Sequence, residues 1–104
     1  MYEPPRFDEQ PAQVREIIDL VRLSYPSVRW SRLQVSHPGA DDDGIWFFSL
    51  PDQPGSVDIE STFGVCPFDV DTDKHRERFI GETVAQVAEK IVQWLALPTG
   101  RSTP

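Results

Sequence analysis

The most reactive side chain in this sequence is its single cysteine, Cys66. A thiol becomes an effective nucleophile when a nearby base or a helix N-terminus lowers its pKa. The imidazoles that can serve as that base are those of His37 and His75, and neither lies in a recognisable catalytic motif. With no second cysteine in the chain, burial as a small apolar residue is the favoured interpretation of Cys66. An enzyme or redox protein that uses Cys66 with one of these histidines, assisted by Asp69 or Asp71, is an alternative function.

Three aspartates alternate over residues 69–73 and could bind a cation: Asp69, Asp71 and Asp73. Alternate side chains of a strand point to the same side, where carboxylates would supply the oxygen ligands of a divalent ion. A helix-loop-helix calcium site, however, would have glycine in place of Lys74 and glutamate in place of Ile80. The sequence therefore favours a solvated acidic surface, with a divalent-cation-binding domain as another alternative. No metal or other cofactor is expected.

Other features that mark catalytic or metal sites do not point to an enzyme. Asp41, Asp42 and Asp43 precede Gly44, but consecutive side chains diverge, and a solvated hairpin tip is the favoured interpretation. The chain has no glycine-rich phosphate loop, no G-x-S-x-G segment and no zinc-spaced set of cysteines and histidines. The sequence therefore favours a protein without catalytic activity.

Length and charge limit the classes of function further. The 104 residues suffice for one domain, which we expect to span residues 1–104 with loosely ordered tails at 1–8 and 98–104. The net charge of −7 would repel the phosphate backbone of nucleic acids and favours a basic partner. The N-terminus lacks the regions of a secretory signal, and the longest apolar run, residues 45–48, is too short for a membrane span. We therefore expect a cytoplasmic protein that binds neither nucleic acid nor membranes.

The first amphipathic helix is expected between Pro11 and Pro26. Proline is well tolerated in the first turn of a helix, and a proline after the last turn prevents the helix from continuing. The apolar stripe at the required spacing consists of Val14, Ile17, Ile18, Val21 and Tyr25. Leu20 and Leu23 fall outside this stripe, which suggests a contact with a loop or a partner.

The second amphipathic helix is expected to begin at Thr83. The spacing of Thr83 and Gln86 has the form of a capping box, which pairs backbone N–H groups at the start of a helix. The apolar stripe consists of Val84, Val87, Ala88, Ile91 and Leu95. Pro98 and Gly100 follow this stripe and indicate where the helix ends.

Four segments have the pattern of β-strands. Residues 57–63 alternate between apolar and polar side chains, and residues 68–71 do so over a shorter span. Residues 45–50 are apolar on both faces and are expected at the centre of a sheet. Residues 28–35 change phase partway, which suggests an edge strand. Short turns between the later strands favour antiparallel connections.

The order of these elements predicts an α+β fold. A helix, four strands and a second helix follow one another, and each helix has one apolar face to bury. The apolar faces of both helices and of the sheet are buried together when both helices cover the same face of the sheet. We therefore expect a two-layer sandwich with a four-stranded antiparallel meander sheet and two helices on one face, in the order α-β-β-β-β-α.

The sheet face that the helices leave open is the predicted binding surface. If Ile45 and Phe47 point toward the helices, Trp46 and Phe48 lie on the open face. The opposite phase of the strand would bury Trp46 and Phe48 and expose the other two residues. Large rings among carboxylates have the composition of an interface with an apolar centre and a polar rim. The predicted binding face consists of Trp46, Phe48, Asp58, Glu60, Asp69 and Asp71. Coverage by the N-terminal arm, by the loop at residues 41–44 or by a second subunit is the competing interpretation.

The second half of the chain resembles a known family. Ile-Glu-Ser at residues 59–61 is followed by Gly64 and by Cys-Pro-Phe at residues 66–68, and Gly-Glu-Thr-Val stands at residues 81–84. This arrangement is similar to that of a family of small uncharacterised bacterial proteins with an I-E-S-x-x-G-x-C-P-F segment, some of which resemble immunity proteins in size and acidity. The resemblance covers residues 45–95. It implies a bacterial, cytoplasmic origin and supplies no catalytic residue or ligand.

These features together favour a small, acidic, non-enzymatic protein-binding module, similar to an immunity protein or an inhibitor. Its expected partner is a basic protein surface or a second copy of the same chain. The enzyme based on Cys66 and the cation site at Asp69, Asp71 and Asp73 are the alternative functions.

Overall fold

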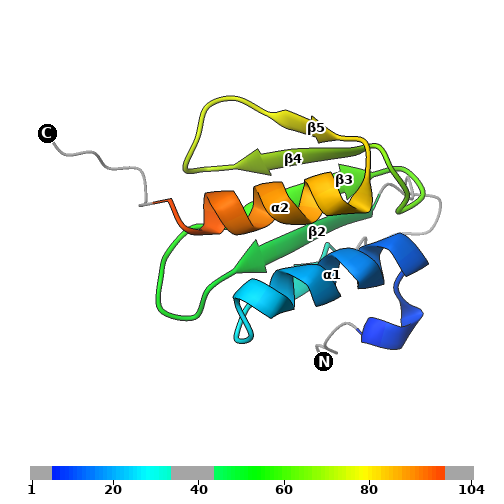
Figure 1. The fold of residues 1–104 in the computed structure, drawn as a ribbon, viewed down its shortest axis with the longest axis horizontal. Helices are drawn as coiled ribbons and strands as arrows, with labels where there is room; N and C mark the ends of the chain where they lie inside the picture. Colours follow the sequence, from blue (N-terminus) through cyan, green and yellow to red (C-terminus); the bar gives the residue numbers. More distant parts are fainter. Residues whose placement is uncertain (1–5, 34–43, 98–104) are drawn as a thin grey trace, which may run out of the picture.

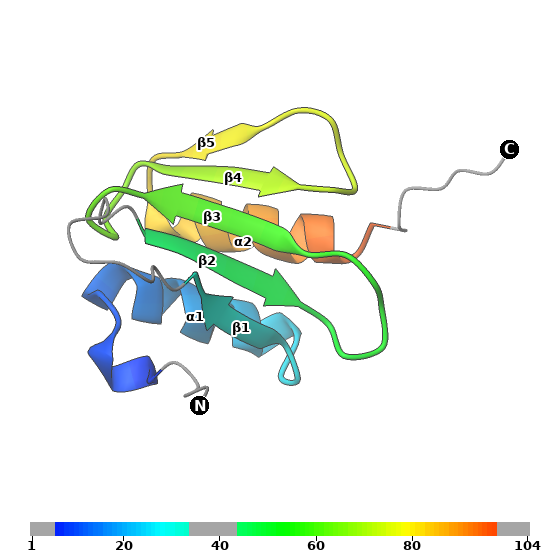
Figure 2. The ribbon, with the colours of Figure 1, turned by 180° about the vertical axis from the view of Figure 1, so that it is seen from behind.

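Both helices of the protein cover the same face of one antiparallel sheet (Figure 1), and the view from behind shows the other face without a helix (Figure 2). The computed structural model describes residues 6–33 and 44–97. Its elements are η1 (Phe7–Glu9, a 3-10 helix), α1 (Ala12–Ser24), β1 (Arg29–Arg32), β2 (Gly44–Ser49), β3 (Val57–Ser61), β4 (Phe68–Thr72), β5 (Phe79–Gly81) and α2 (Val84–Leu95). The α+β class and the antiparallel sheet agree with the sequence prediction.

The sheet is a meander of five strands in the order β1-β2-β3-β4-β5. The prediction of four strands is wrong, because the charged connection after β4 contains β5. In this strand Phe79 pairs with Val70, and Gly81 pairs with Phe68. Three residues are too few to display an alternating pattern, so only the pairing with β4 makes the strand recognisable.

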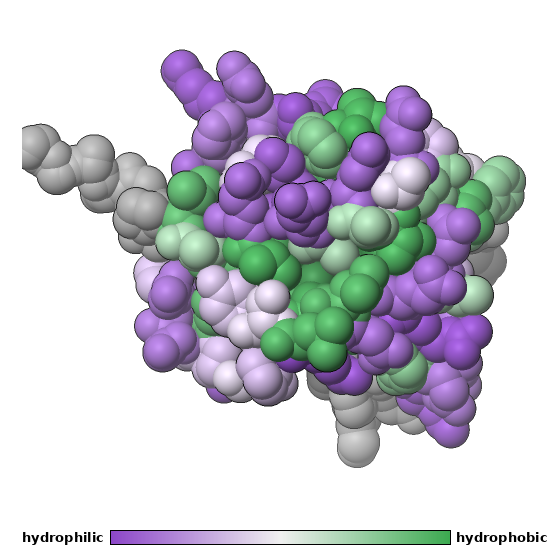
Figure 3. Space-filling view, in the orientation of Figure 1, coloured by the Kyte–Doolittle hydropathy of each residue, from purple (hydrophilic) through white to green (hydrophobic). Residues whose placement is uncertain are grey.

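Helix α1 begins directly after Pro11. The predicted stripe is fully buried at Val14, Ile17, Ile18 and Val21. Leu20 and Leu23 lie outside it, as predicted, and Leu23 is 80% exposed. Apolar side chains gather where the two helices meet (Figure 3). A shallow groove of about 250 Å³ lies there, and Leu20, Ala88 and Val92 are among its lining residues.

The N-terminus of α2 is closed by the predicted pair, Thr83 and Gln86. The Thr83 hydroxyl oxygen accepts a hydrogen bond from the Gln86 backbone N–H at 3.1 Å, and the Gln86 side chain accepts one from the Glu82 N–H at 2.8 Å. These bonds pair backbone N–H groups that have no helical acceptor. The buried face of the helix consists of Val87, Ala88, Ile91, Trp94 and Leu95.

The core contains the two aromatic residues that are predicted to lie on the open face. Trp46 and Phe48 are 0% exposed. They pair with Ile59 and Val57, so these four side chains share the helix-covered face. The predicted phase of β2 is therefore wrong, because a strand that is apolar on both faces does not indicate which face is covered. A physical reason for the observed phase is Gln10, whose Oε1 accepts a hydrogen bond from the buried Trp46 indole N–H at 2.9 Å.

Regular structure begins earlier than the sequence predicts. Phe7 lies in η1 and packs edge-on against Trp30, with 6.3 Å between the ring centroids and 71° between the ring planes. Trp30 pairs with Phe48 and so lies on the helix-covered face. Residues 7 and 8 therefore belong to the fold. The predicted tail at 98–104 and the predicted hairpin tip at 41–43 lie outside the described residues.

Candidate functional site

The candidate nucleophile Cys66 lies in the connection between β3 and β4, half-buried against the core. Its backbone N–H donates a hydrogen bond to the side-chain oxygen of Gln13, on α1, at 2.7 Å. Burial raises the pKa of the thiol, and the negative charge of Glu16 raises it further. A raised pKa reduces the thiolate fraction at neutral pH, which is the opposite of what activation of a nucleophile requires.

The histidine that could activate this thiol lies beyond the other end of β4. Cys66 precedes the strand and His75 follows it, and five residues at roughly 3.3 Å each separate the two positions by on the order of 15 Å. His75 stacks instead on Trp94 of α2, with 5.2 Å between the centroids and 19° between the ring planes. The described residues therefore do not assemble a pair of Cys66 and His75, and His37 lies outside them.

Four carboxylates project from the open face of the sheet, as the alternation predicts. Asp58 and Glu60 belong to β3, and Asp69 and Asp71 belong to β4. The antiparallel register places Asp58 directly opposite Asp71 and Glu60 directly opposite Asp69. Like charges in directly opposed positions destabilise a pair of strands. This part of the sheet therefore loses stability through charge repulsion.

The repulsion contributes to the titration of Asp58. Burial has the largest effect and raises the pKa of its carboxyl group; the hydrogen bond from the Ser56 hydroxyl, at 3.0 Å, lowers it. The charges of Asp71 and Asp73 raise it again, and the net shift is upward. The ion pairs within residues 6–33 and 44–97 lie elsewhere, at the N-terminus and on α1. None of the four carboxylates therefore has a lysine or arginine partner in that part of the chain.

The three alternating aspartates do not gather into a cation site. Asp69 and Asp71 share the open face of β4, but the strand ends at Thr72. The Oδ1 atom of Asp73 instead accepts a hydrogen bond from the Ser56 backbone N–H at 3.3 Å. Within the part of the chain that the structure describes, no group of three His, Cys, Asp or Glu side chains lies close enough to hold a metal ion. The described geometry therefore does not support a divalent-cation site at these aspartates, and this alternative stays a prediction.

The open face also has apolar side chains. Phe47 and Ile45 of β2 pair with the two acidic residues of β3, and both are half-buried. Ile80 of β5 pairs with Asp69 and is 51% exposed. We call this surface the acidic sheet face. It is defined by Ile45, Phe47, Asp58, Glu60, Asp69, Asp71 and Ile80.

The acidic sheet face differs from the predicted binding face only in its apolar members. Trp46 and Phe48 leave the surface because β2 has the opposite phase, and Ile45 and Phe47 replace them. Sequence reasoning misses Ile80 altogether, because three residues of β5 provide no periodic signal.

Comparisons with known proteins add no assignment. No protein-family model, no curated protein and no solved structure matches the chain. The likeness to small bacterial immunity-type proteins and the cytoplasmic localisation therefore stay predictions. None of the helices in the described ranges has the length and apolar character that crossing a membrane requires.

Proposed function

We propose that this protein is a non-enzymatic binding module whose acidic sheet face docks onto a basic surface of another protein, in the manner of an immunity protein or an inhibitor. The observation that carries the proposal is the direct opposition of carboxylates between β3 and β4. Like charges that face each other directly across two strands weaken the isolated fold. Lysine or arginine side chains of a partner, placed between the carboxylates, convert this repulsion into attraction.

The apolar residues of the same face supply the remaining part of an interface. Phe47 and Ile45 lie half-buried beside the carboxylates, and Ile80 is exposed on the neighbouring edge strand. Protein interfaces combine an apolar centre that excludes water with a polar rim. Because exclusion of water strengthens the attraction between opposite charges, the apolar and acidic parts of the face act together.

A basic partner fits this surface better than a second copy of the chain. Two acidic sheet faces placed against each other would bring together four carboxylates from each copy. The chain as a whole has a net charge of −7. Coulomb repulsion opposes such a dimer, most strongly at low ionic strength. The expected partner is a protein surface that is rich in lysine or arginine and has an apolar side chain to contact Phe47.

Selection of binding peptides tests this proposal. Random phage-displayed peptides are selected on the immobilised protein, and the best sequence is synthesised with a fluorescent label for anisotropy titrations. We expect lysine or arginine to be enriched together with an aromatic or aliphatic residue, and the affinity to fall as the salt concentration rises. The double variant Asp58→Asn/Asp71→Asn should bind the peptide at least about tenfold more weakly.

The matched control removes the same amount of charge from the other side of the molecule. Asp19→Asn/Glu89→Gln changes two exposed residues on the helices and should leave the affinity within about twofold of wild type. The Phe47→Ser variant tests the apolar part of the face and should also weaken binding. If the sheet variant and the helix variant lose affinity equally, the peptide responds to net charge alone, and the proposed surface is wrong.

A further inference from the structure

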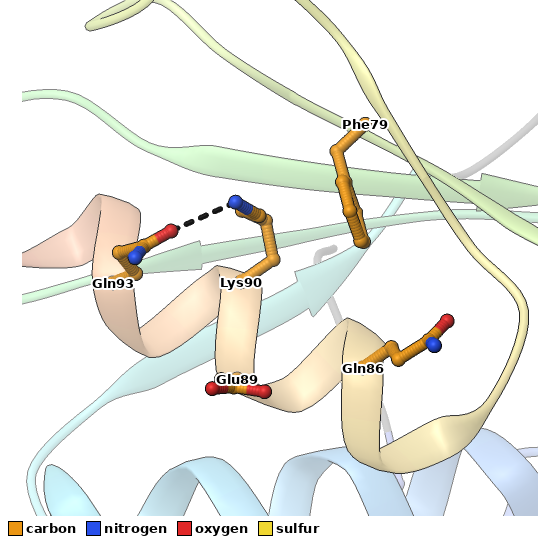
Figure 4. Close-up of a pocket in the computed structure, with 5 residues that line it drawn as sticks. All are labelled: Phe79, Gln86, Glu89, Lys90 and Gln93. Atoms are coloured by element: carbon orange, nitrogen blue, oxygen red, sulfur yellow. Dashed lines mark hydrogen bonds between the residues drawn. The ribbon is translucent and has the colours of Figure 1, made fainter.

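A hollow beside α2 has the features of a small-molecule site and lies apart from the acidic sheet face. It is open to solvent and is bordered by α2, β5 and the connection between β4 and β5, and its volume is about 450 Å³. Small-molecule sites usually occupy about 300–1,000 Å³. The lining residues that determine its chemistry are His75, Arg78, Phe79, Lys90, Trp94 and Leu97. A smaller hollow of about 200 Å³ adjoins it along α2, and Lys90 and Phe79 line both (Figure 4).

The walls of the hollow are held in place by the fold. Phe79 lies on the helix-covered face of the sheet. Lys90 and Trp94 are one helical turn apart and therefore lie on the same side of α2. The loop is tied to the end of this helix, because Lys74 Nζ donates a hydrogen bond to the carbonyl of Leu95 at 3.2 Å. A cation in this position also interacts favourably with the C-terminal end of the helix dipole.

Flat aromatic surfaces converge on the hollow. The His75 imidazole stacks on the Trp94 indole, and the backbone N–H of Glu77 donates a hydrogen bond to His75 Nδ1 at 3.2 Å. Lys90 Nζ lies 4.7 Å from the ring centroid of Phe79 and 5.4 Å from that of Trp94. An ammonium group over two rings is attracted by their π-electrons, so the positive charge has a defined position beside the aromatic surfaces.

The hollow also has an excess of positive charge in a chain that is acidic overall. Lys90 and Arg78 line it, together with one carboxylate, Glu77. An ammonium group has three N–H donors, and within the described residues Lys90 Nζ donates one hydrogen bond to a protein acceptor, Gln93 Oε1, at 2.8 Å (Figure 4). Neither Lys90 nor Arg78 forms an ion pair within residues 6–33 and 44–97. Donors for an anion are therefore available where the rings converge.

We propose that this hollow binds a small ligand in which a carboxylate or phosphate is attached to a flat ring. The anionic group accepts hydrogen bonds from Lys90 Nζ and the Arg78 guanidinium. The ring lies against Phe79 and the exposed imidazole of His75, which is itself held by stacking on the buried Trp94. An aromatic carboxylate and a mononucleotide are two sources of this chemistry. The site is separate from the acidic sheet face, because it attracts the opposite charge and lies on the helix-covered side of the sheet.

An NMR titration of the isotope-labelled protein tests the site with benzoate, adenosine monophosphate and inorganic phosphate. We expect saturable shifts of the Trp94 indole N–H and of the backbone N–H groups of Lys90 and Arg78. One ring-bearing probe should bind at least about tenfold more tightly than phosphate, and its identity distinguishes an aromatic acid from a nucleotide. The Lys90→Met variant retains the aliphatic stem over the rings but loses the ammonium group, and it should bind at least about tenfold more weakly.

Two further variants keep the test decisive. Arg78→Gln changes an exposed loop residue without altering α2 and should weaken binding in the same direction. Arg29→Gln removes one exposed positive charge from β1 and should leave the affinity unchanged. Shifts that do not saturate, equal affinity of wild type and Lys90→Met, or phosphate binding as tight as that of the ring-bearing probes would overturn the proposal. The peptide affinity of the acidic sheet face should be the same in Lys90→Met, so that the two proposals can fail separately.

Discussion

Asp58 of β3 lies directly across from Asp71 of β4, and both carboxylates face the open side of the sheet. Burial raises the pKa of Asp58 most; the hydrogen bond from Ser56 lowers it, and the charges of Asp71 and Asp73 raise it again. The net upward shift means that the folded protein holds a proton on Asp58 more readily than the unfolded chain does. At neutral pH the ionised pair therefore reduces the stability of the fold.

Removal of one charge from this pair should stabilise the protein. In Asp58→Asn the side-chain oxygen can still accept the hydrogen bond from the Ser56 hydroxyl, while the repulsion from Asp71 disappears. We expect the free energy of unfolding near neutral pH to rise by about 0.5 kcal/mol, measured by urea denaturation. Asp52→Asn removes the same charge from the exposed turn after β2 and should have a smaller effect. An equal gain in both variants would assign the effect to net charge rather than to the opposed pair.

The stability advantage of Asp58→Asn should also depend on pH. A carboxyl group with a raised folded-state pKa binds more protons in the folded than in the unfolded state between the two pKa values. The free energy of unfolding that Asp58 contributes therefore falls as the pH rises through this interval. The loss of stability caused by ionised Asp58 is fully present above the raised pKa and absent below the ordinary pKa of 3.8. The difference between variant and wild type should shrink as the pH approaches 3.8, and a constant difference would contradict the assigned cause.

Two glycines in the left-handed backbone region should differ in their tolerance of alanine. Gly64 has a φ of 72° and Gly55 a φ of 94°, where a side chain costs roughly 1–2 kcal/mol. A Cβ at Gly64 would overlap the ring of Pro11, whereas one at Gly55 would meet the flexible end of Lys74 at 2.9 Å. Gly64→Ala should lower the free energy of unfolding by about 3 kcal/mol and Gly55→Ala by about 1 kcal/mol. Equal losses in urea denaturation would show that Pro11 moves aside.

Local patterns in the sequence predict most of the fold. The buried stripe of α1 and the capping pair of α2 each depend on residues within one or two helical turns. The strand Phe79–Gly81 is different, because its pairing with β4 is what defines it. Which face of β2 is buried also depends on a long-range contact, since the Trp46 indole donates a hydrogen bond to Gln10, 36 positions away in the chain. These two errors in the predicted fold concern contacts that no short window of sequence contains.

Of the two candidate sites, one follows from local sequence patterns and the other depends on tertiary contacts. The four carboxylates of the acidic sheet face follow from alternation along β3 and β4, so the sequence predicts their common side correctly. The hollow beside α2 depends on the loop that brings His75 onto Trp94 and Lys74 onto the end of the helix. The sequence shows these residues only as a charged stretch and as part of an amphipathic helix. Their meeting is a consequence of tertiary structure.

The thiol of Cys66 should react more slowly than that of an exposed cysteine. Its pKa is raised first by burial and then by the charge of Glu16, so little thiolate is present at neutral pH. We expect modification by iodoacetamide to show a higher pH midpoint than that of an unstructured peptide with the same local sequence. Glu16→Gln removes the charge and should lower this midpoint without changing burial. A midpoint below that of the peptide would favour the enzyme based on Cys66, because activated thiols have lowered pKa values.

The hydrogen bond between Trp46 and Gln10 should be a substantial source of core stability. The indole N–H donates to Gln10 Oε1 at 2.9 Å in a buried environment, and Gln10 Nε2 donates to the carbonyl of Arg6 at 2.8 Å. Gln10→Ala would leave a buried N–H without a partner, which costs about 1–3 kcal/mol. We expect the free energy of unfolding to fall by about 2 kcal/mol in urea denaturation. Gln53→Ala, in the exposed turn after β2, serves as the control and should have little effect.

A double-mutant cycle separates this hydrogen bond from the packing of the same side chains. Trp46→Phe removes the indole donor, so Gln10→Ala in that background leaves no buried N–H unpaired and should cost less by about 1 kcal/mol or more. The cavity that Trp46→Phe creates is present on both sides of that comparison and therefore cancels. If Gln10→Ala is equally destabilising in both backgrounds, Gln10 acts through its packing or its bond to Arg6. The four urea curves must have equal slopes, because a changed slope indicates a different amount of exposed surface.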